Sequence, residues 1–477
     1  MNAFNIDLRL NAWARRRAGQ GCGLLLSFLL LSLLAACGGG GGSSNESVAP
    51  APAPTPVPVG SATTTLGFSL PRAGLGAAEL AVIVVDGDAQ SEAIAGYYQT
   101  ARGIPAANII RVKLNTGSAT ISVADFAALK ADVDAKLPAG VQATLLTWTA
   151  PSRVVGTCAM SITSAMAFGY DSKYCGGCSA TASSSYFDSE SKHAWVDHKI
   201  RPSMMLGAAS LAAAKTLIDR GVRADASQPA GDGYLLRTSD AARSVRYADF
   251  SGLPAAWAGR LQLNYSDNSA GAAADAIENK SDVLFYFTGL SKVPKLGSIG
   301  FRPGAVADHL TSYGGLLPGS GQMPITDWLD AGATASFGTV EEPCNFTQKF
   351  PKASVLIDQY YRGATVIEAY WKSVHWPGQG LFVGEPLARP FPDSPSFTLE
   401  NGQYLISTRA LRSNASYSLE YRVGAAGTWT ALAAFNNSRA EAQTLRSPLP
   451  PATATELRWR GPCPTNSALQ CTLSASP

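Results

Sequence analysis

Histidine is scarce in this chain, with four residues in 477, and charged residues make up only 15% of it. The 46 glycines follow no fixed period, which excludes a collagen-like protein. A hydrophobic content of 46% is too high for a disordered protein. No polybasic run is present, so binding to lipid headgroups through charge is excluded. What remains is a chain long enough for about two or three globular domains with apolar cores.

The N-terminal segment has the layout of an export signal. Arg9 and the run Arg15 to Arg17 precede an apolar stretch at residues 24–34. The segment ends in Leu-Ala-Ala-Cys37, which resembles a bacterial lipobox and implies cleavage after residue 36 and lipidation of Cys37. An uncleaved transmembrane helix is the alternative, but the apolar stretch is shorter than the roughly 20 residues that a span needs. We therefore expect residues 1–36 to be a lipoprotein signal peptide.

The charge of the chain belongs to this signal. Removing residues 1–36 takes away four arginines and Asp7, so 38 basic and 35 acidic residues become 34 and 34. A formally neutral chain lacks the basic excess of nucleic-acid-binding proteins, which excludes that partner. Residues 37–60 are rich in Gly, Ser and Pro, which is typical of a tether. Gly38 after the lipidated cysteine favours the outer membrane by the usual sorting convention, so the lipid-anchored cell envelope is the expected location.

From residue 79 the pattern is α/β. The apolar run 80–85 is typical of a strand buried on both faces, and a helix to about Arg102 and a strand at 108–114 follow. A helix at 124–137 and a strand at 143–148 complete a β-α-β-α-β repeat, which predicts a mostly parallel sheet. We expect one α/β domain over residues 61–394, interrupted by a cysteine-containing insertion at about 152–202. Short alternating segments predict a small all-β, sandwich-like domain over 395–477.

Six cysteines remain outside the signal and the lipobox, and an even number outside the cytoplasm favours disulfides. They are Cys158, Cys175, Cys178, Cys344, Cys463 and Cys471. The last two are close enough in sequence to pair locally. Among the first three, two can pair, and the third either joins Cys344 or stays free. Cys175-Gly-Gly-Cys178 also fits a redox pair or half of a zinc site, but no second CxxC or well-spaced His pair accompanies it, so no metal is expected.

Polar residues follow three predicted strands, where parallel sheets place their sites. Asp86 and Asp88 follow the first strand, and each is either a turn or helix-capping residue or part of a substrate cleft. His309 and Cys344 lie at the ends of consecutive strand-like segments, 35 residues apart, which predicts a thiol–imidazole pair over the sheet. The alternative is that His309 is structural and that Cys344 is the partner of the odd cysteine in the insertion. Either a nucleophile or a disulfide is possible for that sulfur, not both.

Several segments resemble an uncharacterised bacterial family that occurs in species carrying exosortase, the membrane system that sorts proteins with PEP-CTERM tails. The segments are 80–88, 145–151, 158–164, 303–315, 331–345 and 368–380. The resemblance implies a role in that envelope system, with exported proteins or exopolysaccharide as partners. It implies no established activity.

A more distant resemblance is to gingipain-like, caspase-fold cysteine peptidases, which implies a three-layer caspase/gingipain-like sheet domain. Gly384-Glu-Pro-Leu387 is similar to their closing Gly-Asp-Pro segment. Two registers fit the rest. In one, His309 and Cys344 take the catalytic positions. In the other, residues 287–290 fill the histidine position without a histidine and Asp308-His309 falls near the cysteine position without a cysteine, which implies a caspase-like fold lacking the peptidase pair.

The first hypothesis is a cysteine-dependent, peptidase-like hydrolase acting on exported proteins without a cofactor. Cys344 would attack a peptide carbonyl and His309 would carry the proton, with Asp308 or Glu342 orienting it. Thr288 and Ser312 would line the cleft with the two aspartates after the first strand. The rival is a non-catalytic scaffold that binds a peptide or glycan at the same edge. A third hypothesis is a metal-dependent hydrolase using Asp86, Asp88 and Asp308.

Overall fold

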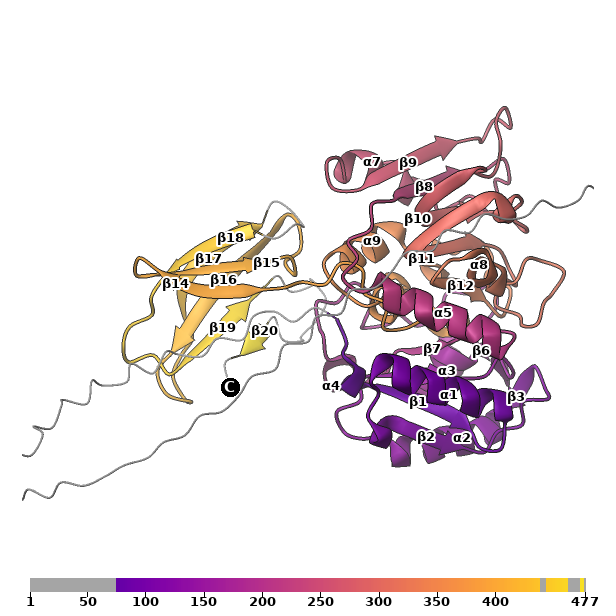
Figure 1. Cartoon of the computed structure of the whole chain (residues 1–477), viewed down its shortest axis with the longest axis horizontal. Coiled ribbons are helices and arrows are strands. Elements are labelled where there is room, and N and C mark those ends of the chain that lie inside the picture. The colour runs from indigo at the N-terminus through magenta and orange to yellow at the C-terminus, as the bar shows by residue number, and fades with distance from the viewer. Residues whose placement is uncertain (1–73, 438–442, 462–471, 476–477) are drawn as a thin grey trace, which may run out of the picture. The chain divides into compact units, whose positions relative to one another are not determined.

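The computed structural model describes residues 74–437, 443–461 and 472–475. The predicted signal peptide, Cys37, the tether and the cysteines Cys463 and Cys471 lie outside these residues. Within them, one sheet of ten strands has the order β2-β1-β4-β7-β13-β12-β11-β10-β8-β9 (Figure 1). The prediction of a mixed α/β fold with a large, mostly parallel sheet is confirmed.

The ten-stranded sheet consists of two parallel halves that run in opposite directions. The first half contains β2 (Ile109–Val112), β1 (Leu80–Val85), β4 (Ala143–Leu146), β7 (Ser203–Met205) and β13 (Gly380–Gly384). The second half contains β12 (Ala335–Thr339), β11 (Ile299–Leu310), β10 (Lys280–Gly289), β8 (Asp232–Arg237) and β9 (Gln262–Asp267). The halves meet where β12 and β13 pair antiparallel. Their carboxyl strand ends therefore face opposite edges of the sheet.

Helix boundaries follow from capping residues in the sequence. α1 (Ala89–Arg102) begins after Asp88, whose carboxylate accepts a hydrogen bond from the Ser91 N–H. It ends at Gly103, which takes the left-handed conformation with φ of 64°. Ser122 and Ser210 cap α2 (Val123–Lys136) and α5 (Leu211–Ala224) in the same way.

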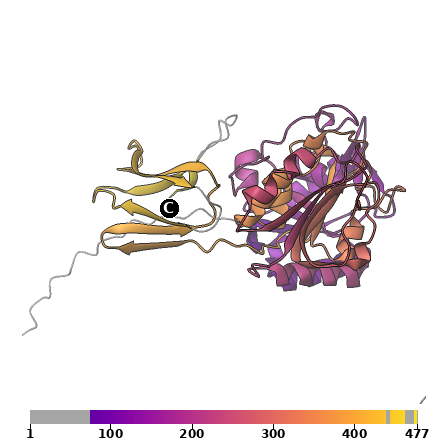
Figure 2. The same cartoon turned by 90° about the horizontal axis from the view of Figure 1, so that it is seen from above.

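The remaining helices are short. They are α3 (Ile162–Phe168), α4 (Ala194–His198), α6 (Tyr247–Phe250), α7 (Leu253–Ala256), α8 (Thr326–Ala331), α9 (Ala353–Tyr361) and α10 (Val366–Ser373). Helices lie on both sides of the sheet (Figure 2). All six residues of β1 are buried, as the apolar run predicted. Trp371 of α10 stacks on Phe382 of β13 with ring centroids 4.4 Å apart, so the core continues from the sheet into its covering helices.

The C-terminal residues form two small antiparallel sheets. One has the order β14-β15-β18 and the other β17-β16-β19-β20. Their strands are β14 (Ser396–Glu400), β15 (Gln403–Thr408), β16 (Ala415–Arg422), β17 (Thr430–Asn437), β18 (Gln443–Pro448), β19 (Glu456–Arg460) and β20 (Thr472–Ala475). Trp459 and Phe435 stack with centroids 5.4 Å apart in a core of their own. Alternation of buried and exposed residues along β15 explains why the sequence pattern could be read as strand.

Some strands have neither an apolar run nor an alternating pattern long enough to predict them. β9 is an edge strand with one fully buried residue, Leu263, so its sequence lacks an apolar run. A separate three-stranded sheet of β3 (Thr120–Ser122), β5 (Arg153–Val155) and β6 (Ala159–Ser161) consists of strands of three residues each. In the described residues, no helix has the length and apolar character needed to cross a bilayer.

Candidate functional site

The ends of β10 and β11 bring three of the predicted site residues together. The two strands are adjacent and parallel, with Phe287 paired to Asp308 and Thr288 paired to His309. All of these side chains are buried, including Thr288 and His309 at 1% exposure. Ser312 follows β11, and its carbonyl accepts a hydrogen bond from the Thr339 hydroxyl at 2.9 Å. The expected grouping at this edge therefore exists, but its side chains do not face an open cleft.

His309 is held by a tryptophan and not by a thiol. Its Nδ1 accepts a hydrogen bond from the Trp328 indole N–H at 2.9 Å, which assigns the imidazole proton to Nε2. Burial lowers the pKa of His309 to about 3, and the charges of Arg246 and Arg243 act in the same direction. The ring is neutral at pH 7, but its one basic lone pair is already occupied. The predicted role of His309 as a general base is therefore not supported by this geometry.

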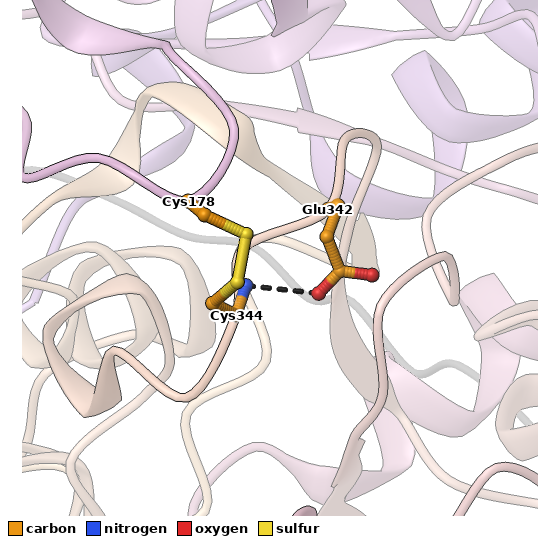
Figure 3. Close-up of side chains that lie close together, drawn as sticks. All are labelled: Cys178, Glu342 and Cys344. Carbon is orange, nitrogen blue, oxygen red and sulfur yellow. Dashed lines mark hydrogen bonds between the residues drawn. A yellow bond between two sulfur atoms is a disulfide. The ribbon is translucent and has the colours of Figure 1, made fainter.

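Cys344 is not a free thiol in the structure. Its Sγ is bonded to that of Cys178, 166 residues earlier in the chain (Figure 3). Cys158 is bonded to Cys175. A disulfide sulfur has no thiolate with which to attack a carbonyl, so the predicted Cys344–His309 pair is wrong for this state. The alternative, in which Cys344 is the partner of the odd insertion cysteine, describes the structure.

The two residues proposed to orient the histidine have other partners. Glu342 Oε1 accepts a hydrogen bond from the backbone N–H of Cys344 at 2.9 Å (Figure 3). Asp308 Oδ1 lies 2.6 Å from Arg246 Nη1, and both side chains are buried. Burial raises the pKa of Asp308, whereas the Arg246 charge acts to lower it. Neither carboxylate contacts the His309 ring, which removes the third member of the predicted catalytic group.

Arg246 connects the strand ends to the surface. Its Nη2 donates to the Thr288 carbonyl at 2.8 Å, and its Nη1 donates to the Pro351 carbonyl at 3.3 Å. One guanidinium therefore binds the end of β10, the Asp308 carboxylate on β11 and the segment before α9. A planar group with five donors suits such a position. Sequence reasoning did not single out this arginine because nothing in its local pattern distinguishes it from an exposed one.

Asp86 and Asp88 lie between β1 and α1, in the first half of the sheet domain. Asp88 caps α1 and also accepts a hydrogen bond from the Thr116 hydroxyl at 3.1 Å. Asp86 is half-exposed and lies 3.5 Å from Arg111. Because β1 and β11 belong to halves that run in opposite directions, these two aspartates and Asp308 lie at opposite edges. The hypothesis of one metal site shared by all three is therefore wrong.

One group of three potential metal ligands occurs among the described residues. The ligand atoms of Cys178, Glu342 and Cys344 all lie within 4.8 Å of one another. A thiophilic ion would need deprotonated, separate sulfurs, and here the two sulfurs are bonded to each other. The residues present therefore fit a disulfide in this state and not a metal centre.

A cavity of about 390 Å³ opens beside this edge, between Arg246 and the segment that precedes α9. Apolar and polar residues both line it, and of the polar ones Arg246 and Ser373 are buried and Lys352 is exposed. The lining residues are Phe187, Val245, Arg246, Ala248, Asp249, Thr347, Gln348, Phe350, Pro351, Lys352, Ser373 and His375. None of the predicted site residues lines it. His375 is the one signal that the sequence offered, since it is one of four histidines and lies in a segment that carries the family resemblance.

A larger surface groove of about 1010 Å³ lies along β2 and α2 and includes Asp86. Two of the basic side chains on its walls are paired, Arg111 with Glu92 at 2.8 Å and Lys136 with Asp132 at 2.7 Å. A ligand would have to break these exposed pairs to use their charge. The smaller cavity, which aromatic residues help to line, is the better candidate for binding.

Comparison with known proteins assigns no family. No protein-family model matches the chain, and no curated protein matches it. A solved structure described as "Structure of Protease" is similar over 80% of this chain and 94% of its own, with 10% sequence identity and a TM-score of 0.41. A TM-score of 0.41 does not establish a shared fold.

Proposed function

We propose that this protein is a non-catalytic binding protein that takes an extended peptide in the cavity beside the ends of β10 and β11. The observation that carries the proposal is the state of the predicted pair: Cys344 is in a disulfide and the His309 lone pair is occupied. The same edge retains a cavity of about 390 Å³, within the usual size range of roughly 300–1,000 Å³ for ligand sites.

The lining favours an aromatic side chain flanked by a carboxylate. Phe187, Phe350 and Pro351 supply apolar and aromatic walls, and His375 lies against Phe187 with ring centroids 4.7 Å apart. Lys352 is exposed at the rim and can pair with an anionic group of the ligand. Asp249 is the acidic residue of the lining. Its carboxylate already accepts hydrogen bonds from the Ser354 N–H and hydroxyl, at 3.0 and 2.6 Å, so it has partners other than Lys352.

The proposal includes a caspase-like fold without peptidase chemistry for the α/β region. Of the two registers that fit the gingipain-like peptidases, the one without catalytic residues is favoured, because the other register needs a free Cys344 thiol and that sulfur is bonded to Cys178. The ends of β10 and β11, which the favoured register uses, are neighbours. Glu385, in the segment similar to Gly-Asp-Pro, is fully buried and binds Tyr98 and Arg102, which is a structural role.

Location in the lipid-anchored envelope and a role in the exosortase system belong to the same proposal. Two disulfides among the described residues support a compartment where such bonds persist. In that setting the peptide would come from an exported protein. The lipid anchor is expected at Cys37, and Gly38 after it is the feature that favours the outer membrane.

Peptide binding can be tested with the capped peptide acetyl-Ala-Ala-Phe-Asp-Ala-amide by calorimetry. We expect saturable binding that is lost in Ala248→Trp, which fills the cavity mouth from an exposed position on α6. Ala255→Trp on α7, exposed and outside the cavity, is the matched control. Replacing Phe by Ala in the peptide should abolish binding, and Lys352→Gln should weaken it more than Lys292→Gln. Equal binding by Ala248→Trp and the unmodified protein would exclude this cavity as the site.

A further inference from the structure

The Cys178–Cys344 disulfide joins two segments that line the candidate cavity. Cys178 belongs to the insertion, which also supplies Phe187 to one wall. Cys344 lies three residues before Thr347, where a second lining segment begins and continues to Lys352. Opening this bond therefore removes the covalent link between the two walls.

The noncovalent contacts around this bond converge on the same short loop. The Glu341 carboxylate accepts hydrogen bonds from the backbone N–H groups of Gly176 and Gly177, at 3.3 and 3.0 Å. Lys349 donates from Nζ to the Gly177 carbonyl. Lys349 is fully buried. In the sequence it lies between Cys344 and the cavity-lining residue Phe350. The wall is also held away from the insertion, because Trp376 N–H donates to the Gln348 carbonyl at 2.8 Å and Lys352 N–H donates to the Ser373 carbonyl at 2.9 Å. The loop at Gly176 and Gly177 is therefore one of several attachments that set the position of this wall.

The two disulfides differ in access. Cys178 is exposed and Cys344 is half-buried, whereas in the other disulfide Cys158 is half-buried and Cys175 is 5% exposed, so Cys178 is the one exposed cysteine of the four. An incoming thiolate can therefore reach the sulfur of Cys178 before it can reach Cys175. A carboxylate oxygen of Glu342 lies within 4.8 Å of both sulfurs and opposes the thiolate character that develops during exchange, whereas the Lys349 ammonium, bound to the carbonyl of the neighbouring Gly177, acts in the other direction.

We infer that the Cys178–Cys344 bond is a redox-sensitive latch that controls ligand binding in the cavity. This inference rests on the proposed function. The reductant is a dithiol of the kind that acts on exported proteins. Its first thiolate attacks Sγ of Cys178, the bond to Cys344 breaks, and Cys344 leaves as a thiolate that takes a proton. The second thiol attacks the mixed disulfide, which releases Cys178 as a thiol and leaves the reductant as a disulfide.

Opening the latch should weaken binding because the wall is no longer held in its binding conformation. A ligand then has to order residues 345–352, and the cost appears as lost affinity. We expect the dissociation constant of the peptide to rise by roughly three- to tenfold, which corresponds to a binding-competent fraction of about one third to one tenth.

The experiment compares four forms of the full chain with acetyl-Ala-Ala-Phe-Asp-Ala-amide. They are the oxidised protein, the protein reduced with dithiothreitol and alkylated, Cys178→Ser/Cys344→Ser, and the matched control Cys158→Ser/Cys175→Ser. Mass spectrometry of the alkylated protein should find Cys178 and Cys344 modified at reductant concentrations that leave Cys158 and Cys175 bonded. The first double variant should bind as weakly as the reduced protein, and the control should bind as the oxidised protein does.

Hydrogen exchange of residues 345–352 provides a readout that does not depend on the peptide. We expect faster exchange there in the reduced protein and in Cys178→Ser/Cys344→Ser. Equal peptide affinity in the oxidised and reduced forms would overturn the latch and leave the proposed function intact. Earlier opening of the Cys158–Cys175 bond would also overturn it. Absence of peptide binding in every form would overturn the proposed function, and the latch with it.

Discussion

The indole N–H of Trp328 donates to Nδ1 of His309 across 2.9 Å, and both side chains are buried. This bond makes His309 part of the core. An imidazole in that position must stay neutral, because a proton on Nδ1 would break the bond and place a charge among apolar residues. Its buried position therefore makes the free energy of unfolding sensitive to pH.

The first prediction concerns acid stability. The pKa of His309 is lowered to about 3 in the folded protein, so its contribution to stability is complete above pH 6.5 and is lost as the pH falls toward 3. Between pH 7 and pH 5 this one group should cost about 2 kcal/mol of unfolding free energy. His309→Gln, whose side-chain oxygen can still accept from Trp328, should lack that component. Urea denaturation at both pH values measures it.

His193 supplies the control for this measurement. It is exposed, so His193→Gln controls for the replacement of a histidine outside the core. If His309→Gln kept the full loss of stability between pH 7 and pH 5, the buried neutral imidazole would not be its source.

The second prediction concerns the two disulfides. In the loop-entropy description, Cys178–Cys344 closes a separation of 166 residues and Cys158–Cys175 one of 17. Cys178→Ser/Cys344→Ser should therefore lose about 2 kcal/mol more unfolding free energy than Cys158→Ser/Cys175→Ser. Chemical denaturation of both double variants measures the difference. A larger loss in the short-loop variant would contradict the assignment of the stabilisation to the unfolded chain.

The third prediction concerns the buried ion pair of Arg246 and Asp308. Arg246→Met removes the cation and leaves a buried carboxylate without its charge partner, which should cost about 3–5 kcal/mol. Arg246→Met/Asp308→Asn should recover part of that loss, because the uncompensated charge is gone. Arg223→Met, at an exposed position on α5, should change stability by less than about 0.5 kcal/mol. A double variant less stable than Arg246→Met would argue against this explanation.

The fourth prediction uses two glycines inside helices. A Cβ at Gly221 of α5 would lie 2.3 Å from Oε2 of the buried Glu385, whereas a Cβ at Gly96 of α1 would have nothing within 4 Å. Gly221→Ala should therefore destabilise the protein by about 1–3 kcal/mol through overpacking. Gly96→Ala should stabilise it by about 0.5–1 kcal/mol, because alanine favours the helix. Thermal denaturation of the pair gives effects of opposite sign, and the same sign in both would refute the packing argument.

Strands and helices with strong local signals could be predicted from the sequence. The run at 80–85 and the apolar segment Gly380–Gly384 are fully buried strands, and the Asp88 cap and Gly103 stop fix α1. β9 could not be predicted, because an edge strand needs no apolar run. Its extended conformation is stabilised by pairing with β8. The antiparallel pairing of β12 with β13 depends on how β13 inserts between β7 and β12, and no local sequence pattern encodes that placement.

The candidate site was less predictable than the fold. The sequence placed His309 and Cys344 after neighbouring strands, and β11 and β12 are indeed neighbours. It could not predict that the imidazole is hydrogen-bonded to Trp328, because that depends on side-chain packing. Nor could it predict which cysteine forms a disulfide with Cys344, because that depends on the path of the insertion. The sequence left open which two of the three insertion cysteines pair and whether the third joins Cys344. Only the path of the insertion decides for Cys158–Cys175 and Cys178–Cys344. The cavity residues come from segments far apart in the chain and share no motif.

The reversal between β12 and β13 also shapes the electrostatic character of the sheet edges. A helix that follows a carboxyl strand end directs the positive end of its dipole toward that edge. Because the two halves run in opposite directions, the start of α1, which follows β1, lies at the edge opposite to the carboxyl ends of β10 and β11. A ligand in the cavity beside β10 and β11 would therefore not meet the positive end of the α1 dipole.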